Sequence, residues 1–421
     1  MKSVLAGSKA DVIAALDVGT SRVCCAIAQP DGAGDARLLG IGETASHGIR
    51  AGNVVDMAAA EMAVRNAVDA AERMAKVTLD RVVVSLSGGT PQSTPVAVEV
   101  PVSGRTVTDG DLRRAAASHT IGDRLTPERE AGREIVQTIA TGYAIDGCRG
   151  IRDPRGMHGR ELGMTMHVVT AASGPLRNLR QCVERCHLDV EAVVVAPYAT
   201  GLGTLVDEEA ELGATVIDMG GGTTSVAVFS EGEAVFADVI PLGGQHVTND
   251  IARGLSTSRA NAERMKTLYG DATTGARDTR EILEVPQVGE ETEGAAQRIP
   301  RSLLTGIIQP RLEETFELVR ERLESHGVDR VAGRRAVLAG GACQMPGTRE
   351  LAETVLGKQV RIGTPADTAG LGRTTNGPGY AVSAGMLTYA LAADPAGLPR
   401  GDLRAPSGVL GRLGTWLREY L

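Results

Sequence analysis

The sequence predicts an α/β protein of two duplicated lobes, with a subdomain inserted into the first lobe and an amphipathic helix at the C-terminus. The chain has 421 residues, which is too long for one compact core. A β-rich pattern around a Gly/Thr turn occurs twice in it. Strands and helices alternate between the two copies, as in α/β domains. One segment breaks this alternation, which predicts the insertion.

The repeated pattern is a β-hairpin whose turn opens with an aspartate. In the first copy, residues 12–27 form two apolar runs around the turn Asp17-Val18-Gly19-Thr20-Ser21. In the second copy, residues 215–229 surround the turn Asp218-Met219-Gly220-Gly221-Gly222-Thr223-Thr224-Ser225. Runs rich in β-branched residues and bounded by Gly and Thr predict strands. We therefore expect a duplicated domain that carries one hairpin in each copy.

Hydrophobic periodicity predicts the other elements. Strands are expected at residues 82–86, 166–170 and 336–339, and helices at residues 58–76, 176–186, 257–269 and 302–325. In the inserted segment, a strand at 96–100 and a capped helix at 109–118 precede Gly/Arg-rich loops. Residues 285–299 are polar and are expected to form a loop.

These elements divide the chain into lobes and subdomains. The first lobe is expected to comprise residues 11–86, 166–198 and 375–389, with the inserted subdomain at 87–165. The second lobe is expected to comprise residues 199–246 and 303–374, with a side subdomain at 247–302. Residues 390–407 are rich in Pro and Gly, which predicts a linker to a terminal helix at 408–421.

Composition narrows the classes of function. Lys and Arg total 44 against 52 Asp and Glu, and this net charge of -8 argues against a general nucleic-acid binder. No segment approaches the ~20 apolar residues of a membrane-spanning helix. Residues 1–10 lack the apolar core of a secretory signal. We therefore expect the chain to stay in the cytoplasm.

The six cysteines are dispersed and contain no CxxC pair, which predicts reduced and mostly buried thiols. Cys182, Cys186 and His187 form the one cluster with metal-ligand residue types. The two cysteines also continue the apolar helical stripe of Leu176 and Leu179. This periodicity favours core packing over a metal site.

The two hairpins carry the chemistry of an anion site. A turn rich in Gly, Thr and Ser presents backbone N–H groups and hydroxyls, which suit phosphate oxygens. The aspartate that opens each turn repels a bare phosphate, so this arrangement requires a cation such as Mg2+. One such turn is also ordinary hairpin chemistry. Two copies in equivalent positions favour a nucleotide with Mg2+.

A third glycine turn follows the predicted strand at 336–339. Gly340, Gly341 and Ala342 end this strand, and a helix is expected at 348–355. Paired glycines let a flat ring lie against the backbone without a clash with Cβ. The turn is therefore a candidate adenosine site, although a plain strand-to-helix turn also uses glycine.

The order of these three elements resembles the ATPase superfamily of actin, hexokinase and heat-shock chaperones across residues 11–389. Within it, the chain is most similar to the FtsA family of bacterial cell-division proteins. The similarity lies in the second turn, in Tyr143-Ala144-Ile145-Asp146 with Gly150-Ile151-Arg152-Asp153-Pro154, and in Ala262-Glu263-Arg264-Met265-Lys266. The resemblance implies an actin-like fold, and that family carries its inserted subdomain at the same place.

The resemblance assigns roles to individual residues. Gly19, Thr20 and Ser21 would form the first phosphate loop, and Gly220, Gly221, Gly222, Thr223 and Thr224 the second. Asp17 and Asp218 would hold Mg2+ through water. Glu263 and Lys266 would reach the ribose hydroxyls and the adenine edge, although their spacing alone predicts a solvated ion pair.

The chain departs from the superfamily at one catalytic point. Related ATPases place an acidic or amide side chain near the start of the helix between the lobes, where this chain has Val195-Ala196-Pro197-Tyr198-Ala199. The FtsA family often has Gln before the aromatic residue at Tyr143, where this chain has Thr141-Gly142. Gln137 is the nearby amide. The catalytic residue stays unassigned, and we expect slow or weak ATP hydrolysis at most.

The last fourteen residues have the pattern of a membrane-binding helix. Their apolar side chains share one helical face: Val409, Leu410, Leu413, Trp416, Leu417 and Tyr420. The single Trp of the chain lies here, behind the Pro-rich tether. So short a helix is marginal in water, so it should fold on an apolar surface such as a bilayer. A helix docked on the body is the alternative, and the FtsA family has a membrane-targeting helix here.

The two hairpins predict a protein that binds ATP and Mg2+, and the resemblance implies that it polymerises on the cytoplasmic face of the bacterial membrane at the division site. The resemblance implies the tubulin-like FtsZ as the direct partner, with other division proteins possible. One alternative is a pilus-assembly scaffold of the PilM type, which should lack the amphipathic tail. The other is a small-molecule kinase, which requires a catalytic Asp that we cannot name.

Overall fold

The computed structural model describes residues 12–31, 36–102, 105–118, 125–275, 281–288, 296–365 and 377–392. The predicted linker beyond residue 392 and the terminal helix with its membrane-facing residues lie outside this part of the chain. Within it, no helix has the length and apolar character needed to cross a bilayer.

The first lobe is built on a mixed sheet in the order β11-β6-β1-β2-β3. Its strands are β1 (Ile13–Val18), β2 (Arg22–Pro30), β3 (Ala36–Ala45), β6 (Arg81–Leu86) and β11 (Asp189–Val195). The small hairpin of β4 (Ile49–Arg50) and β5 (Asn53–Val54) lies beside it. Two helices pack against one another on this lobe, α1 (Met57–Ala75) and α5 (Ser173–Glu184). The predicted β1–β2 hairpin is confirmed, with Asp17 opposite Cys24.

The second lobe repeats this topology in the order β14-β13-β12-β17-β18. Its strands are β12 (Ala214–Met219), β13 (Thr224–Ser230), β14 (Glu233–Ile240), β17 (Arg335–Ala339) and β18 (Gln359–Ile362). In both sheets an antiparallel hairpin is followed by two parallel strands. Asp218 lies opposite Ser225, the position that Asp17 has in the first hairpin. The predicted duplication is therefore confirmed at the level of strand order and register.

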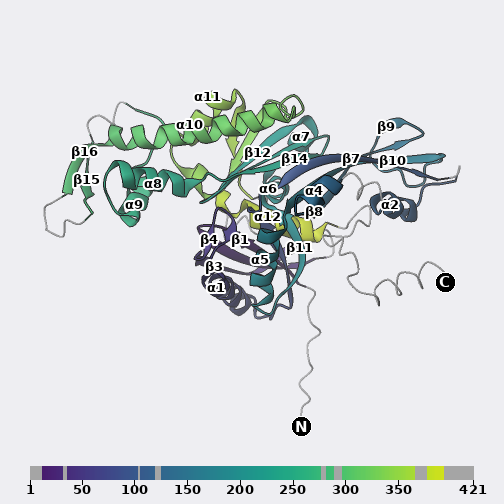
Figure 1. The fold of residues 1–421 in the computed structure, drawn as a ribbon, viewed down its shortest axis with the longest axis horizontal. Helices are drawn as coiled ribbons and strands as arrows, with labels where there is room; N and C mark the ends of the chain where they lie inside the picture. Colours follow the sequence, from purple (N-terminus) through teal and green to yellow (C-terminus); the bar gives the residue numbers. More distant parts are fainter. Residues whose placement is uncertain are drawn as a thin grey trace, which may run out of the picture.

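Two helices join the lobes. They are α6 (Ala196–Thr204), which follows β11, and α12 (Ala381–Leu391), and they lie between the sheets in Figure 1. Their backbones touch, because a Cβ on Gly385 would lie 1.6 Å from the Ala199 carbonyl oxygen and one on Gly203 would lie 2.4 Å from that of Ala381. Only glycine allows two helices to cross this closely.

The inserted subdomain is an antiparallel sheet in the order β7-β10-β8-β9, and it extends away from the lobes in Figure 1. Its elements are β7 (Gln92–Pro101), α2 (Asp109–Ala116), α4 (Thr126–Glu130), β8 (Arg133–Ile145), β9 (Cys148–Ile151) and β10 (Glu161–Ala172). The expected loops after residue 118 were wrong over β8, which is a long strand of this sheet, but residues 152–160 do form a loop. Residues 166–172, expected in the first lobe, pair here with β7 and β8.

The inserted sheet is joined to the second lobe through a small polar contact. Ser93 of β7 accepts a hydrogen bond from the Ala237 N–H of β14 at 2.8 Å. The Nδ1–H of the buried His167 on β10 donates to the Ala234 carbonyl oxygen at 2.9 Å, and its Nε2 lies 2.7 Å from the Ser93 hydroxyl. Burial lowers the pKa of His167 to about 4. A neutral imidazole therefore helps to fix the inserted sheet on β14.

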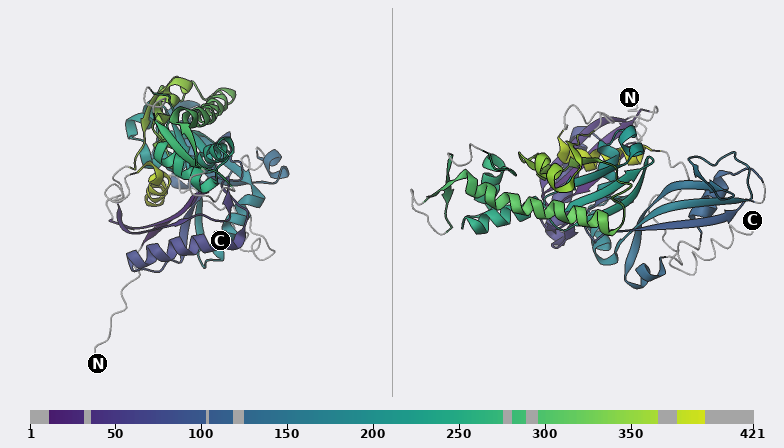
Figure 2. Two further views of the ribbon diagram at one scale, coloured as in Figure 1. Left: turned by 90° about the vertical axis from the view of Figure 1, so that its left-hand side faces the viewer. Right: turned by 90° about the horizontal axis from the view of Figure 1, so that it is seen from above.

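The side subdomain of the second lobe contains α8 (Gly244–Gly254), α9 (Arg259–Tyr269), β15 (Ile282–Pro286) and β16 (Ala296–Pro300). The predicted loop at 285–299 was wrong at both ends, because β15 and β16 pair as an antiparallel ribbon. From there the long helix α10 (Arg301–Ser325) runs back over the second lobe (Figure 2). The short α7 (Asp207–Leu212) and α11 (Thr348–Leu356) complete this lobe.

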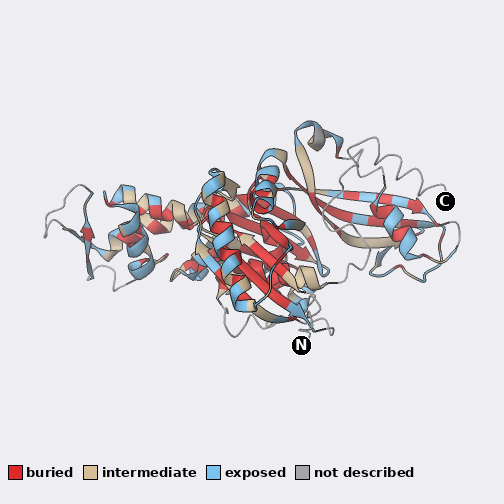
Figure 3. Cartoon of the chain, turned by 90° about the horizontal axis from the view of Figure 1, so that it is seen from below, coloured by how far each residue is buried: buried red, intermediate tan, exposed pale blue. Residues whose placement is uncertain are grey.

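The buried residues concentrate on the strands of the two central sheets and on the helix faces that cover them (Figure 3). Each lobe has its own apolar core, and a further core lies in the inserted subdomain. Cys182 is fully buried on α5 with Leu176 and Val183, as the apolar stripe predicted. Two separate cores joined by two helices leave a cleft between the lobes.

Candidate nucleotide site

The predicted site residues gather around a cleft of about 1070 Å³ between the lobes. Most of them line it: Asp17, Gly19, Thr20, Ser21, Asp218, Gly220, Gly221, Thr223, Thr224, Glu263, Lys266, Gly340, Gly341 and Ala342. Gly222 packs against Thr20 of the first hairpin. Segments more than three hundred residues apart in the chain therefore meet at one place.

The first turn is held rigidly by its own lobe. The Gly19 N–H donates to the Arg22 carbonyl oxygen at 3.0 Å, and the Thr20 hydroxyl oxygen accepts from the Gly52 N–H at 3.0 Å. The Asp17 carboxylate accepts a hydrogen bond from the Ser85 hydroxyl at 2.7 Å. Ser85, at the end of β6, was not predicted from the sequence. It fixes the carboxylate at the floor of the cleft.

The second turn lies directly against the first. A Cβ on Gly221 would lie 1.8 Å from the Ser21 hydroxyl oxygen, and one on Gly222 would lie 2.5 Å from the hydroxyl oxygen of Thr20. Both distances are far below any real Cβ contact, so the triple glycine lets the two lobes approach each other. The two turns therefore meet at the same end of the cleft.

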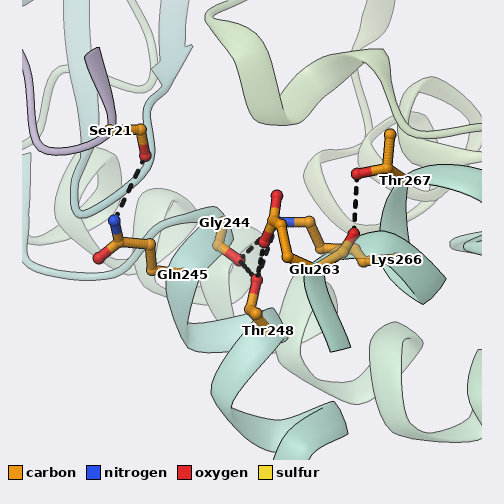
Figure 4. Close-up of polar contacts among 7 residues, drawn as sticks. All are labelled: Ser21, Gly244, Gln245, Thr248, Glu263, Lys266 and Thr267. Atoms are coloured by element: carbon orange, nitrogen blue, oxygen red, sulfur yellow. Dashed lines mark hydrogen bonds and ion pairs between the residues drawn. The ribbon is translucent and has the colours of Figure 1, made fainter. Parts of the chain in front are cut away.

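The start of α8 at residues 243–245, which the sequence analysis missed, supports the second turn. The N–H groups of Gly244 and Gln245 donate to the carbonyl oxygens of Gly220 and Gly221 at 3.0 and 2.7 Å. The Gln245 amide reaches across the cleft and donates to the Ser21 hydroxyl at 3.4 Å (Figure 4). The available signal was the Gly243–Gly244 pair between a strand and a helix, the same pattern as at Gly340.

The two aspartates create a site that favours a cation. Burial, together with the charge of Asp17, raises the pKa of Asp218 to about 7, and burial also raises the pKa of Asp17. A divalent cation between them would relieve the repulsion. The Thr224 hydroxyl, buried beside them, has no hydrogen-bond partner within the described residues. These residues fit a magnesium ion and phosphate oxygens.

Arg22 was also missed by the sequence analysis. Its guanidinium donates to the Gly379 carbonyl oxygen at 2.6 Å and lies 4.4 Å from the centroid of the Tyr380 ring. Gly379 and Tyr380 belong to η3 (Pro378–Tyr380), the short turn before α12. Arg22 therefore ties the first hairpin to the helix pair that joins the lobes.

The third glycine turn forms the far wall of the cleft. Gly340 has φ of +85°, and a Cβ on it would lie 2.5 Å from Asp218 Oδ1. Gly341 begins η1 (Gly341–Gln344), and a Cβ on it would meet no atom within 4 Å. The backbone conformation at position 340 thus requires glycine, whereas the missing side chain of Gly341 leaves open space in the cleft. This space fits a flat ring.

Glu263 and Lys266 line the cleft from α9 and form an ion pair of 2.7 Å. The Lys266 ammonium group also donates to the Thr248 hydroxyl at 2.9 Å and to the Gly244 carbonyl oxygen at 3.1 Å. Thr248 on α8 is a further residue that the sequence analysis did not select. The pair is therefore anchored on the neighbouring helix, unlike a solvated surface pair.

The start of α6 presents no titratable or amide side chain to the cleft, since Ala196 is its lining residue there. Gln137 on β8 is buried, and its Oε1 accepts a hydrogen bond from the Val195 N–H at 3.2 Å. Its Nε2 lacks a partner among the described residues. Gln137 therefore supports the junction between β11 and α6 from the inserted subdomain.

The comparisons with known proteins match this architecture. The family model "Cell division protein FtsA" matches residues 215–385, and "SHS2 domain inserted in FTSA" matches residues 88–170. The "Cell division protein FtsA" of Rhizobium meliloti (strain 1021) is 40% identical over 431 residues, covering 99% of this chain and 96% of the relative. The chain belongs to the FtsA family of cell division proteins. This sequence relationship decides against the PilM-type and kinase alternatives.

Solved structures place this FtsA-family chain in the actin-like fold. The chain of a "PilM-PilN type IV pilus biogenesis complex" aligns with a TM-score of 0.63 at 16% identity, over 90% of this chain and 99% of that one. MreB5 of Spiroplasma citri bound to ADP aligns with a TM-score of 0.52 at 15% identity, over 91% and 97%. At these identities the likeness shows the fold alone, which confirms the predicted architecture.

Proposed function

We propose that the chain binds Mg2+-ATP in the cleft and polymerises with it on the cytoplasmic face of the bacterial membrane, where it tethers FtsZ filaments at the division site. The observation that supports this most directly is the meeting of two Asp-Gly hairpins from duplicated lobes. The ADP bound by the MreB5 relative supports a nucleotide in this fold. Family membership supports the role in division.

The residues of the cleft divide into four groups in this proposal. Asp17 and Asp218 hold Mg2+ through water, and the two hairpin turns bind the phosphates through their N–H and hydroxyl groups. The Gly341 space takes the base, and Glu263 and Lys266 lie at the sugar and base end. Bound Mg2+ would supply the positive charge that both carboxylates and the phosphate oxygens require.

Hydrolysis is slow in this proposal, because Ala196 at the start of α6 offers no group that orients water. A positioned base contributes about 100- to 10,000-fold to a rate, and this gain is missing here. Nucleotide then acts chiefly as a ligand that joins the lobes. Its binding energy stabilises the closed cleft, from which the chain self-associates.

The terminal helix binds the membrane only weakly as a monomer. Burying Leu410, Leu413 and Trp416 contributes roughly 1.5 to 3 kcal/mol each, but folding the helix consumes much of this gain. In a polymer each further tail binds intramolecularly, which raises the affinity on the order of 100-fold or more. The tether at 394–407 spans roughly 20 Å as a coil, enough for neighbouring tails to reach one bilayer.

Liposome co-sedimentation tests this function. The samples are the full chain, a chain ending at Ser407 and Trp416→Glu, each with and without ATP, and FtsZ is then added to each. We expect the full chain to pellet in an ATP-dependent manner and to bring FtsZ with it, and we expect both variants to stay in solution. Equal pelleting of the truncated chain would show that the tail does not anchor the protein.

A further inference from the structure

All three N–H donors of Lys266 are used within the protein, so none is left for a nucleotide. An ammonium group has three N–H donors. Those of Lys266 point at Glu263 Oε2 at 2.7 Å, at the Thr248 hydroxyl at 2.9 Å and at the Gly244 carbonyl oxygen at 3.1 Å, as Figure 4 shows. Its side chain is only 14% exposed. Lys266 therefore acts on the cleft through the residues that it holds.

Thr248 is the centre of this cluster. Its side chain is buried, and its hydroxyl lies 2.5 Å from Glu263 Oε2 and 3.0 Å from the Gly244 carbonyl oxygen. A hydroxyl has one proton, and the charged carboxylate at the shorter distance is the stronger acceptor. Glu263 Oε2 thus receives hydrogen bonds from Thr248 and from Lys266, which fix the plane of the carboxylate.

The other oxygen of Glu263 is free for a ligand. The side chain is 53% exposed and lines the cleft, and no group in the described ranges bonds to Oε1. A carboxylate oxygen only accepts hydrogen bonds, so its ligand must be a donor. At the sugar end of the proposed nucleotide site, the donors are the ribose hydroxyls.

We propose that Thr248 is a positioning residue that orients Glu263 toward the ribose and thereby makes the cleft prefer ribonucleotides over 2′-deoxyribonucleotides. The proposal rests on the nucleotide site proposed above. A site that hydrogen-bonds the 2′-hydroxyl favours ATP over dATP, because dATP keeps the 3′-hydroxyl but lacks this donor. Because Glu263 is 53% exposed and water can replace the lost donor, we expect an ATP over dATP preference of about 10-fold.

The chain offers a matched control for Thr248. The Thr267 hydroxyl also contacts Glu263, but it donates to the backbone carbonyl oxygen at 2.8 Å, as in many helices. Thr248→Val and Thr267→Val therefore remove the same chemical group from the same neighbour. Only Thr248→Val removes a hydrogen bond from the carboxylate, which then keeps the one from Lys266 alone. Thr248→Ser keeps the hydroxyl and should restore the preference.

The experiment measures the affinities of the full chain for Mg2+-ATP and Mg2+-dATP by calorimetry, with the thermal midpoint of each variant as the folding check. We expect the ratio of the two affinities to fall at least fivefold in Thr248→Val and to stay near the wild-type value in Thr267→Val and Thr248→Ser. If Thr248 had a purely structural role, Thr248→Val would lower the affinities for both ligands equally. An unchanged ratio would therefore overturn the proposal.

Equal affinities of the wild-type chain for ATP and dATP would also overturn the proposal, while leaving the nucleotide site intact. A wild-type chain that binds neither ligand would instead overturn the proposed function, and this inference with it. The two failures are therefore separated by the wild-type measurement alone.

Discussion

The adjacent glycines of the third turn should respond in opposite ways to the same substitution. In Gly341→Ala the new methyl group enters open space in the cleft, since a Cβ there meets no atom within 4 Å. In Gly340→Ala it would lie 2.4 Å from the Met219 carbonyl oxygen at a φ of +85°. One variant therefore changes the space for a ligand, and the other strains the fold.

The expected magnitudes follow from these contacts. Gly340→Ala combines a backbone conformation that essentially only glycine adopts, at a cost of about 1–3 kcal/mol, with overpacking of about 1–3 kcal/mol, so the free energy of unfolding should fall by roughly 2–6 kcal/mol. Gly341→Ala should change it by less than about 0.5 kcal/mol. If a base lies on Gly341, the methyl group should weaken ATP binding about 5- to 100-fold.

Urea unfolding and ATP calorimetry on both variants measure these effects. Gly341→Ala should keep the wild-type unfolding midpoint and bind ATP weakly. Wild-type ATP affinity in this variant would refute the assignment of the base to the open space. Wild-type stability of Gly340→Ala would refute the argument from backbone conformation, whatever its affinity for ATP.

Two further predictions concern turnover and pH. ATP turnover should lie far below the ordinary enzyme rate of about 10 per second, because Ala196 provides no water-orienting group. Phosphate release measures this rate, and a value of about 10 per second would show that another group orients the water. His167 is buried neutral with a pKa of about 4, so the unfolded chain binds a proton that the folded chain does not. The free energy of unfolding should therefore fall by up to about 3 kcal/mol as the pH falls from about 6.5 toward 4. Urea unfolding at pH 7.5 and at pH 5 measures this loss, which should be smaller in His167→Gln.

The sequence was sufficient where one physical signal dominated. Both hairpins have apolar runs around a turn that needs glycine, and the structure confirms their strands. The long helix at 301–325 carries an apolar stripe over its whole length, and it is confirmed as α10. Family-specific motifs then pointed to the fold as a whole, which the comparison with PilM and MreB5 confirms.

The strands that the sequence analysis missed lack a clear hydrophobic pattern, for identifiable reasons. The pairing of β8 with β10 has register shifts between Thr165 and Met166 and between Val169 and Thr170, which break the alternation of a regular strand. The ribbon of β15 and β16 buries only Leu283, Val285 and Ile299, and each of its strands ends in a proline, which is uncommon in strands. Such a segment looks like a loop until its partner is known.

The missed site residues become functional only through tertiary contacts. Thr248 resembles any polar residue in a helix until α9 packs beside it and places Lys266 and Glu263 on its hydroxyl. Ser85 and Asp17 are 68 residues apart, and their contact depends on the parallel pairing of β1 and β6. A single sequence does not encode these neighbours locally.

The central claim is that two acidic hairpins form one Mg2+-nucleotide site, and calorimetry with Asp218→Asn tests it most directly. This substitution keeps the shape of the side chain and removes its charge. We expect the wild-type chain to bind one ATP with Mg2+, and we expect its affinity to fall more than about tenfold both in EDTA and in Asp218→Asn, because the bound cation is the main local charge. ATP affinity that is unchanged by chelation and by Asp218→Asn would contradict the claim.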